Sequence, residues 1–249
     1  MTLGTSRSPA NDSGPGREIL RRCRIIGGLF PLGAFMPESR CSPVSPDHRT
    51  RARVAALAAM AGASLFLMVG TALQFLRADL AWQQATMSQY LLGPGGLLLR
   101  IAYCALAIAI VVLAMGIYRQ LSVHARSAAP LLLLCTGAVA LAGVAIGDSW
   151  LPSIAPDFHR WFHHTCAITA FLCVTGGMVL QAWRFRLDPA WRSFFPLAAG
   201  WSLGCQGLLW MHALWPPAGQ GWVQKLLIAL IVIAMLLAGT WLWRAARVR

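Results

Sequence analysis

Six long apolar runs fill the sequence between residues 54 and 243. The runs cover residues 54–76, 97–118, 129–150, 161–183, 194–215 and 222–243. A run of about 20 residues crosses the hydrocarbon core of a bilayer when it forms an α-helix. Because lipid offers no partner to a free backbone N–H or C=O group, such a run has to be helical. The sequence therefore predicts an all-α integral membrane bundle of six transmembrane helices.

The composition agrees with a membrane protein and excludes other classes. Hydrophobic residues make up 57% of the chain and charged residues 12%, whereas roughly a quarter of a soluble domain is charged. The net charge of +13 would suit a nucleic-acid-binding protein if the cations shared one water-facing surface. Here the arginines lie at the ends of the apolar runs, so the expected partner is the lipid bilayer and not nucleic acid.

Arginine and lysine are divided unequally between the two sides of the predicted bundle. One side has Arg49, Arg51, Arg53, Arg119, Arg126, Arg184, Arg186, Arg192, Arg244, Arg247 and Arg249. The other side has Arg77, Arg100, Arg160 and Lys225. Cytoplasmic loops are enriched in Lys and Arg, so both termini are predicted to be cytoplasmic, with the chain multi-pass in the inner (cytoplasmic) membrane.

Aromatic, glycine and proline residues add detail to this topology. Tryptophans near the helix ends predict an aromatic belt at each interface: Trp150, Trp161, Trp215 and Trp222 outside, and Trp183, Trp191, Trp241 and Trp243 inside. Helices are expected to stop or start at Gly93-Pro94-Gly95-Gly96, Pro152, Pro156, Asp188-Pro189 and Pro216-Pro217. Two small-residue pairs, Gly143/Gly147 and Gly200/Gly204, predict close packing between helices of the bundle.

The N-terminal segment differs from the rest of the chain. Residues 1–48 are basic and rich in Pro, Gly and Ser, without sustained apolar periodicity, and we expect them to be mostly disordered. The transmembrane domain then covers residues 49–249. Met36 is a candidate for the true start of the chain.

The predicted outer side carries the polar residues with chemical potential. His159 and His163 are four residues apart, so they share one face of a helix and suit a divalent metal ion. Asp148 and His212 lie at the same side and complete a candidate metal site of Asp148, His159, His163 and His212. In the alternative interpretation, His163 or His164 only hydrogen-bonds Asp148 across two helices and nothing is bound.

Two further candidates remain at this side. Haem iron could be held between His212 and either His163 or His164. Ser88 is a candidate nucleophile, although no base stands beside it in the sequence and a capping role explains it equally. The catalytic candidates are therefore Asp148, His163 and Ser88. The sequence leaves open whether the chain is a metal-dependent membrane hydrolase of lipid-like or periplasmic substrates, a haem protein, or a membrane component without enzymatic activity.

Four short motifs resemble a family of prokaryotic membrane proteins known as domain of unknown function family 998. They are Ser88-Gln89-Tyr90-Leu91-Leu92-Gly93 before the second predicted helix, Gly147-Asp148-Ser149 closing the third, His159 or His163 opening the fourth, and Gly221-Trp222-Val223-Gln224-Lys225 opening the last. The resemblance covers roughly residues 54–243. It implies a multi-pass topology and no particular activity.

Overall fold

The computed structural model describes residues 46–214 and 220–248, and within these ranges all regular structure is helical. Its long helices are α2 (Pro46–Leu76), α3 (Gly96–Gln120), α4 (Ala128–Ile154), α5 (Pro156–Phe185), α6 (Phe195–Leu214) and α7 (Gln220–Val248). Two short 3-10 helices, η1 (Met87–Leu91) and η2 (Arg192–Phe194), lie in the connections. Residues 1–45 lie outside the described residues. They include Met36, the proposed start, and nearly all of the segment 1–48 that was predicted to be disordered.

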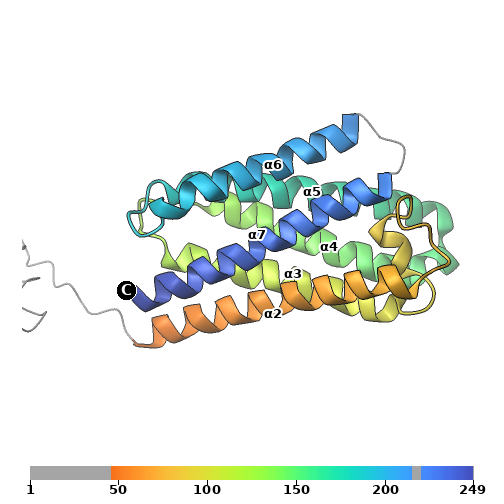
Figure 1. Cartoon of the computed structure of the whole chain (residues 1–249), viewed down its shortest axis with the longest axis horizontal. Helices are drawn as coiled ribbons and strands as arrows, with labels where there is room; N and C mark the ends of the chain where they lie inside the picture. The colour runs from red at the N-terminus through yellow and green to blue at the C-terminus, as the bar shows by residue number, and fades with distance from the viewer. Residues whose placement is uncertain (1–45, 215–219, 249) are drawn as a thin grey trace, which may run out of the picture. The chain divides into compact units, whose positions relative to one another are not determined.

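The six long helices form an up-and-down bundle (Figure 1). Each helix packs against its neighbour in the sequence, and α7 closes the bundle by lying against both α2 and α3. Figure 1 shows that α2 begins and α7 ends at the same end of the bundle, as an even number of crossings requires. Helix α6 is the outermost helix, because it packs against α5 and α7 only through a narrow strip of buried residues.

The chain is a multi-pass membrane protein. Five of its helices, α2, α3, α4, α5 and α7, are long and apolar enough to cross a bilayer. Helix α6 has 20 residues, but Gln206 and His212 lower its hydropathy. It nevertheless connects the end of α5 to the beginning of α7, which lie at opposite ends of the bundle (Figure 1), so the six-helix prediction holds.

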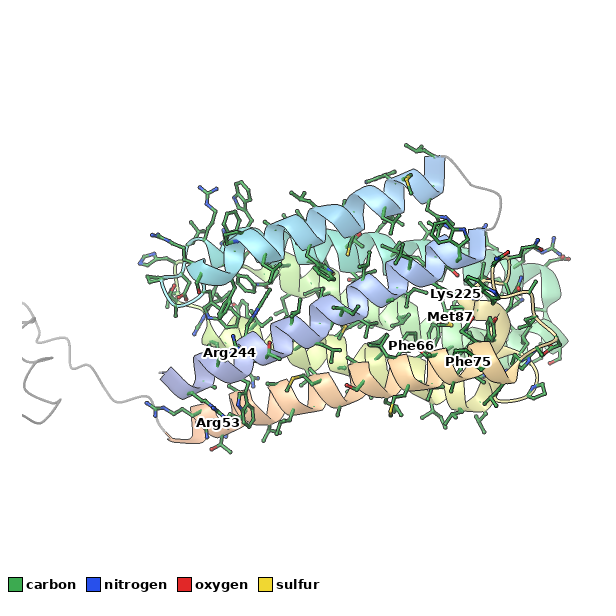
Figure 2. All side chains as sticks on the ribbon, viewed as in Figure 1. Arg53, Phe66, Phe75, Met87, Lys225 and Arg244 are labelled. Carbon is green, nitrogen blue, oxygen red and sulfur yellow. The ribbon has the colours of Figure 1, made fainter. Side chains whose placement is uncertain are left out.

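The two ends of the bundle differ in charge. Figure 2 shows Arg53 and Arg244 at one end, which we call the cationic end, and Lys225 and Met87 near the opposite end. At the cationic end the buried carboxylate of Asp188 accepts hydrogen bonds from the backbone N–H groups of Ser122 (2.7 Å) and Ala190 (2.9 Å). This carboxylate ties the α3–α4 connection to the α5–α6 connection.

Two tryptophans of this end are not where the sequence predicted them. Trp191 and Trp241 are buried, and together with Phe185 and Phe194 they form a stacked aromatic cluster inside the bundle. The prediction that they belong to an interfacial belt was wrong, because Trp191 stacks on Phe185 and Trp241 stacks on Phe194 of η2. Trp183, by contrast, is exposed and remains available to the interface.

The proline and glycine predictions were correct in part. Helix α3 begins at Gly96 as expected, and Gly95 before it has φ +77, a conformation that favours glycine. Pro152 does not end a helix, because α4 continues through it to Ile154. A Cβ on Gly147 would lie 2.7 Å from Phe162 of α5, so this glycine permits the close approach predicted for α4. Gly200 and Gly204 have no atom within 4 Å of such a Cβ, so the predicted packing in α6 was wrong.

Candidate metal centre

A tight helical hairpin creates the site. Ala155 is the single residue between α4 and α5, and its backbone (φ −149, ψ 77) is not helical. Pro156 follows in the first turn of α5, where its fixed φ suits a helix start and its missing N–H is not needed. The last turns of α4 therefore lie directly beside the first turns of α5, and Asp148 faces His159 and His163.

The three side chains meet at one carboxylate oxygen. Oδ1 of Asp148 lies 2.7 Å from Nε2 of His159 and 2.9 Å from Nδ1 of His163. Asp148 is only 4% exposed, whereas both imidazoles are partly exposed. The candidate ligand atoms of the three residues all lie within 4.8 Å of one another.

This donor set fits a divalent transition metal. Two imidazole nitrogens and one carboxylate oxygen, with a fourth position left for water, are the ligands of many catalytic zinc sites. Ligand atoms about 2.1 Å from a tetrahedral zinc ion are about 3.4 Å apart. The two N–O distances at Asp148, 2.7 and 2.9 Å, are shorter than this by about 0.5–0.7 Å, so the side chains would have to move apart by that much to admit the ion.

Pro152 contributes to the site through its backbone. Because proline has no N–H, it cannot make the hydrogen bond that a helix would direct from position 152 to the carbonyl of Asp148. That carbonyl instead faces Nη2 of Arg100 on α3, at 3.4 Å. The local helix defect thus brings a guanidinium group next to the backbone of the buried carboxylate.

The trio lines an open cleft of about 510 Å³ at this end of the bundle. The cleft is lined by Ser88, Gln89, Leu92, Asp148, His159, Arg160, His163 and His164. Ser88 and Gln89 come from η1 and Leu92 from the connection after it, and the others come from α4 and α5. A small molecule could therefore reach the candidate metal position from outside the bundle.

Helix α7 holds the η1 segment in place over the cleft. The side-chain oxygen of Gln224 accepts a hydrogen bond from the backbone N–H of Met87 (3.0 Å), the residue before Ser88. The hydroxyl oxygens of Ser88 and Thr86 are 3.2 Å apart. Gly221 allows α7 to begin against this connection, since a Cβ there would be 2.6 Å from the backbone carbon of Gln84.

Lys225 anchors the same region from the next position of α7. Its Nζ donates to the side-chain oxygen of Gln74 on α2 (2.6 Å) and to the carbonyl of Trp82 (2.7 Å), and it lies 3.4 Å from the hydroxyl of Tyr90. It also lies 4.8 Å from the centre of the Tyr90 ring. Burial raises the pKa of Tyr90, which keeps the phenol neutral beside the lysine.

An ion pair closes the α2–η1 connection. Arg77 donates to both carboxylate oxygens of Asp79 at 2.8 Å, and to the carbonyl of Leu92 at 2.6 Å. The hydrogen bonds from Arg77 hold the pKa of Asp79 below its ordinary value. This pair fixes the turn through Gly93, which has φ +77.

The remaining predicted residues are placed differently. His212 does not belong to the group formed by Asp148, His159 and His163, and its buried Nδ1 has no hydrogen-bond partner among the described residues. His164 is exposed at the rim of the cleft. The haem alternative gains no support from this arrangement, because His163 is directed to Asp148.

Residues 60–241 match a family model described as a protein of unknown function (DUF998). The chain belongs to the DUF998 family. No match was found among the curated proteins or among the solved structures. In this DUF998 protein, all four motifs on which the sequence resemblance rested meet at the end of the bundle opposite the cationic end.

The sequence motifs contain Gln224, Lys225 and Tyr90, but they do not reveal that these three residues together join α7 to η1. Lys225 and Gln74 are 151 residues apart, so their contact depends entirely on how α7 closes the bundle. For Arg100 the sequence predicted only a position on the side of the bundle with fewer cations. The sole available signal was that a lysine and an arginine occur inside apolar runs, where a charged group requires a partner.

Proposed function

We propose that this DUF998 protein is a metal-dependent hydrolase whose ion is bound by Asp148, His159 and His163. The observation that carries this proposal is the buried carboxylate shared by two imidazoles in the wall of an open cleft. Zinc is the best-fitting ion, because it prefers nitrogen and oxygen ligands in a tetrahedral arrangement with one position free for water.

The proposed reaction is hydrolysis of a carboxylic ester or amide. Asp148, His159 and His163 would hold the zinc ion, which would supply a bound water of lowered pKa and polarise a carbonyl oxygen. The water oxygen adds to the carbonyl carbon, the bond to the leaving oxygen or nitrogen breaks, and the leaving group takes a proton that originates from the water. No electron acceptor or donor is needed. Ser88 lines the cleft beside the trio and is placed to hydrogen-bond the substrate rather than to attack it.

The excess of arginine at the cationic end supports a cytoplasmic location for that end and for both termini. The cleft then faces the outside of the inner membrane. Its substrate would reach the site from the periplasmic side or from the outer leaflet of the bilayer.

Metal analysis of the full-length protein in mild detergent tests the proposal. After incubation with zinc and removal of the excess, we expect stoichiometric zinc in the wild type and in His164→Ala, and little in Asp148→Ala or His163→Ala. His164→Ala is the matched control, because His164 neighbours His163 and lines the same cleft. A set of p-nitrophenyl esters from acetate to laurate serves as the activity probe.

The possible results separate the alternatives. Zinc-dependent ester hydrolysis that is lost in His163→Ala but kept in His164→Ala supports the hydrolase. A wild-type protein that takes up no stoichiometric zinc overturns the proposal, and the Asp–His contact then only joins α4 to α5. Stoichiometric zinc without hydrolysis of any ester leaves a metal site but overturns the reaction.

A further inference from the structure

A second, apolar cavity lies next to the cleft, inside the membrane-spanning part of the bundle. It has a volume of about 70 Å³ and shares Ser88 and His163 with the cleft as lining residues. Away from these two residues and Gln224 its walls are almost entirely hydrocarbon, from α2, α3, α4, α5 and α7. The polar groups are therefore gathered at the end that adjoins the candidate metal centre.

The cavity is long and narrow. On α5 its lining extends from His163 through Ala167 and Ala170 to Val174. His163 and Val174 are eleven positions apart, which corresponds to about 16 Å along the helix axis. An apolar lining that continues over this length suits a flexible hydrocarbon chain. Phe66 of α2, which points into the bundle (Figure 2), packs edge-to-face against Tyr103 and closes one side.

An apolar cavity of this kind does not favour water. Groups that could hold a water molecule by several hydrogen bonds are missing from most of its lining, and such cavities stay dry or bind apolar ligands. We infer that the cavity holds the acyl chain of a lipid substrate, so that the bond next to the acyl carbonyl lies at the centre formed by Asp148, His159 and His163. This inference rests on the proposed hydrolase function and assigns acyl esters or acyl amides as its substrate class.

The far end of the cavity sets the length of chain that it accepts. Ile110 and Val174 line this cavity and also another apolar cavity, of about 80 Å³, which lies nearer the cationic end. These two residues therefore lie between the two cavities. Shortening one of them would join the cavities and give room to a longer acyl chain.

Two opposite changes of cavity volume test the inference. Ala167→Leu and Ala170→Leu fill the cavity, and we expect the preference for p-nitrophenyl laurate over p-nitrophenyl acetate to fall by about tenfold or more. Ala61→Leu, the same substitution at an exposed position of α2, is the matched control and is expected to keep the preference. Val174→Ala is expected to move the preferred ester from laurate towards palmitate, a gain that a misfolded variant would not show.

A binding measurement makes this inference independent of catalysis. Lauric acid carrying a photoreactive diazirine at its methyl end should label peptides around Val174 in the wild type and in Asp148→Ala, and label them less in Ala170→Leu. Labelling of these peptides without any ester hydrolysis retains the acyl site and rejects the hydrolase. Zinc-dependent hydrolysis with an unchanged chain-length preference in all three cavity variants, and labelling only on lipid-facing residues, overturns the acyl site and retains the hydrolase.

Discussion

Zinc should stabilise the protein through a site that a single substitution removes. A ligand that binds only the folded state at a hundred times its Kd adds about 2.7 kcal/mol to the free energy of unfolding. For a chain of this size each kcal/mol raises the melting temperature by about 2–4 °C. Near-saturating zinc is therefore expected to raise the wild-type melting temperature by about 5–10 °C.

The substitution His163→Ala should abolish this increase and also lower the melting temperature without metal. It removes one of the three ligand atoms and one of the two hydrogen bonds to the buried Asp148. A hydrogen bond to a charged group contributes about 1.5–3 kcal/mol. Because the imidazole of His163 is partly exposed, we take the lower end, which corresponds to a melting temperature about 3–6 °C below that of the wild type.

The assay is thermal denaturation of the detergent-purified protein, followed by intrinsic tryptophan fluorescence with and without zinc. His164→Ala is the control, since His164 is exposed and lies outside the Asp148 group, and it should behave as the wild type in both conditions. A wild-type melting temperature that zinc leaves unchanged, or a full increase in His163→Ala, would refute zinc binding at these three residues.

Three further substitutions test the surroundings of the site. Lys225→Met should lower the free energy of unfolding by about 2 kcal/mol, because it removes the strong hydrogen bonds that join α7 to Gln74 of α2 and to Trp82 in the connection after it, and unchanged thermal stability would contradict this. Asp188→Asn should cost about 1–3 kcal/mol in the same assay while zinc uptake stays at the wild-type level, and lost zinc uptake would show that the two ends are coupled. Because Arg77 lowers the pKa of Asp79, the stabilisation from this pair is present above the ordinary value of 3.8 and is lost as the pH falls through the lowered pKa. Asp79→Asn should therefore show a smaller drop in melting temperature between pH 6 and pH 3 than the wild type, and equal drops would refute this.

The helices were predictable from sequence because the bilayer imposes their length. The predicted run 97–118 and the helix Gly96–Gln120 differ by two residues or fewer at each end, and glycine explains the sharp start. At the N-terminal side the prediction was less accurate, since α2 begins at Pro46 whereas the apolar run begins at residue 54. A helix does not have to end where the hydrocarbon ends, so hydropathy alone does not locate its polar extension.

Only the part of the candidate site that depends on local geometry was predictable from the sequence. A spacing of four placed His159 and His163 on one face of α5, and the short link to α4 brought them to Asp148. The exclusion of His212 could not be read from the sequence, because it depends on the outermost position of α6 in the bundle. The burial of Trp191 has the same kind of cause, since an aromatic residue at a helix end is equally compatible with an interfacial belt and with a core.

Two buried carboxylates, Asp148 and Asp188, differ in a way that favours the end opposite the cationic end for the proposed site. Asp188 is held by backbone N–H groups, which cannot bind a cation and which fix two connections to each other. Asp148 lies within hydrogen-bond distance of two imidazoles, whose nitrogens are also the ligand atoms that a divalent metal prefers. Asp188 is fully buried, whereas Asp148 lines an open cleft and lies next to His163, which lines both this cleft and an apolar cavity. The same residue type is thus structural at one end and suited to chemistry at the other.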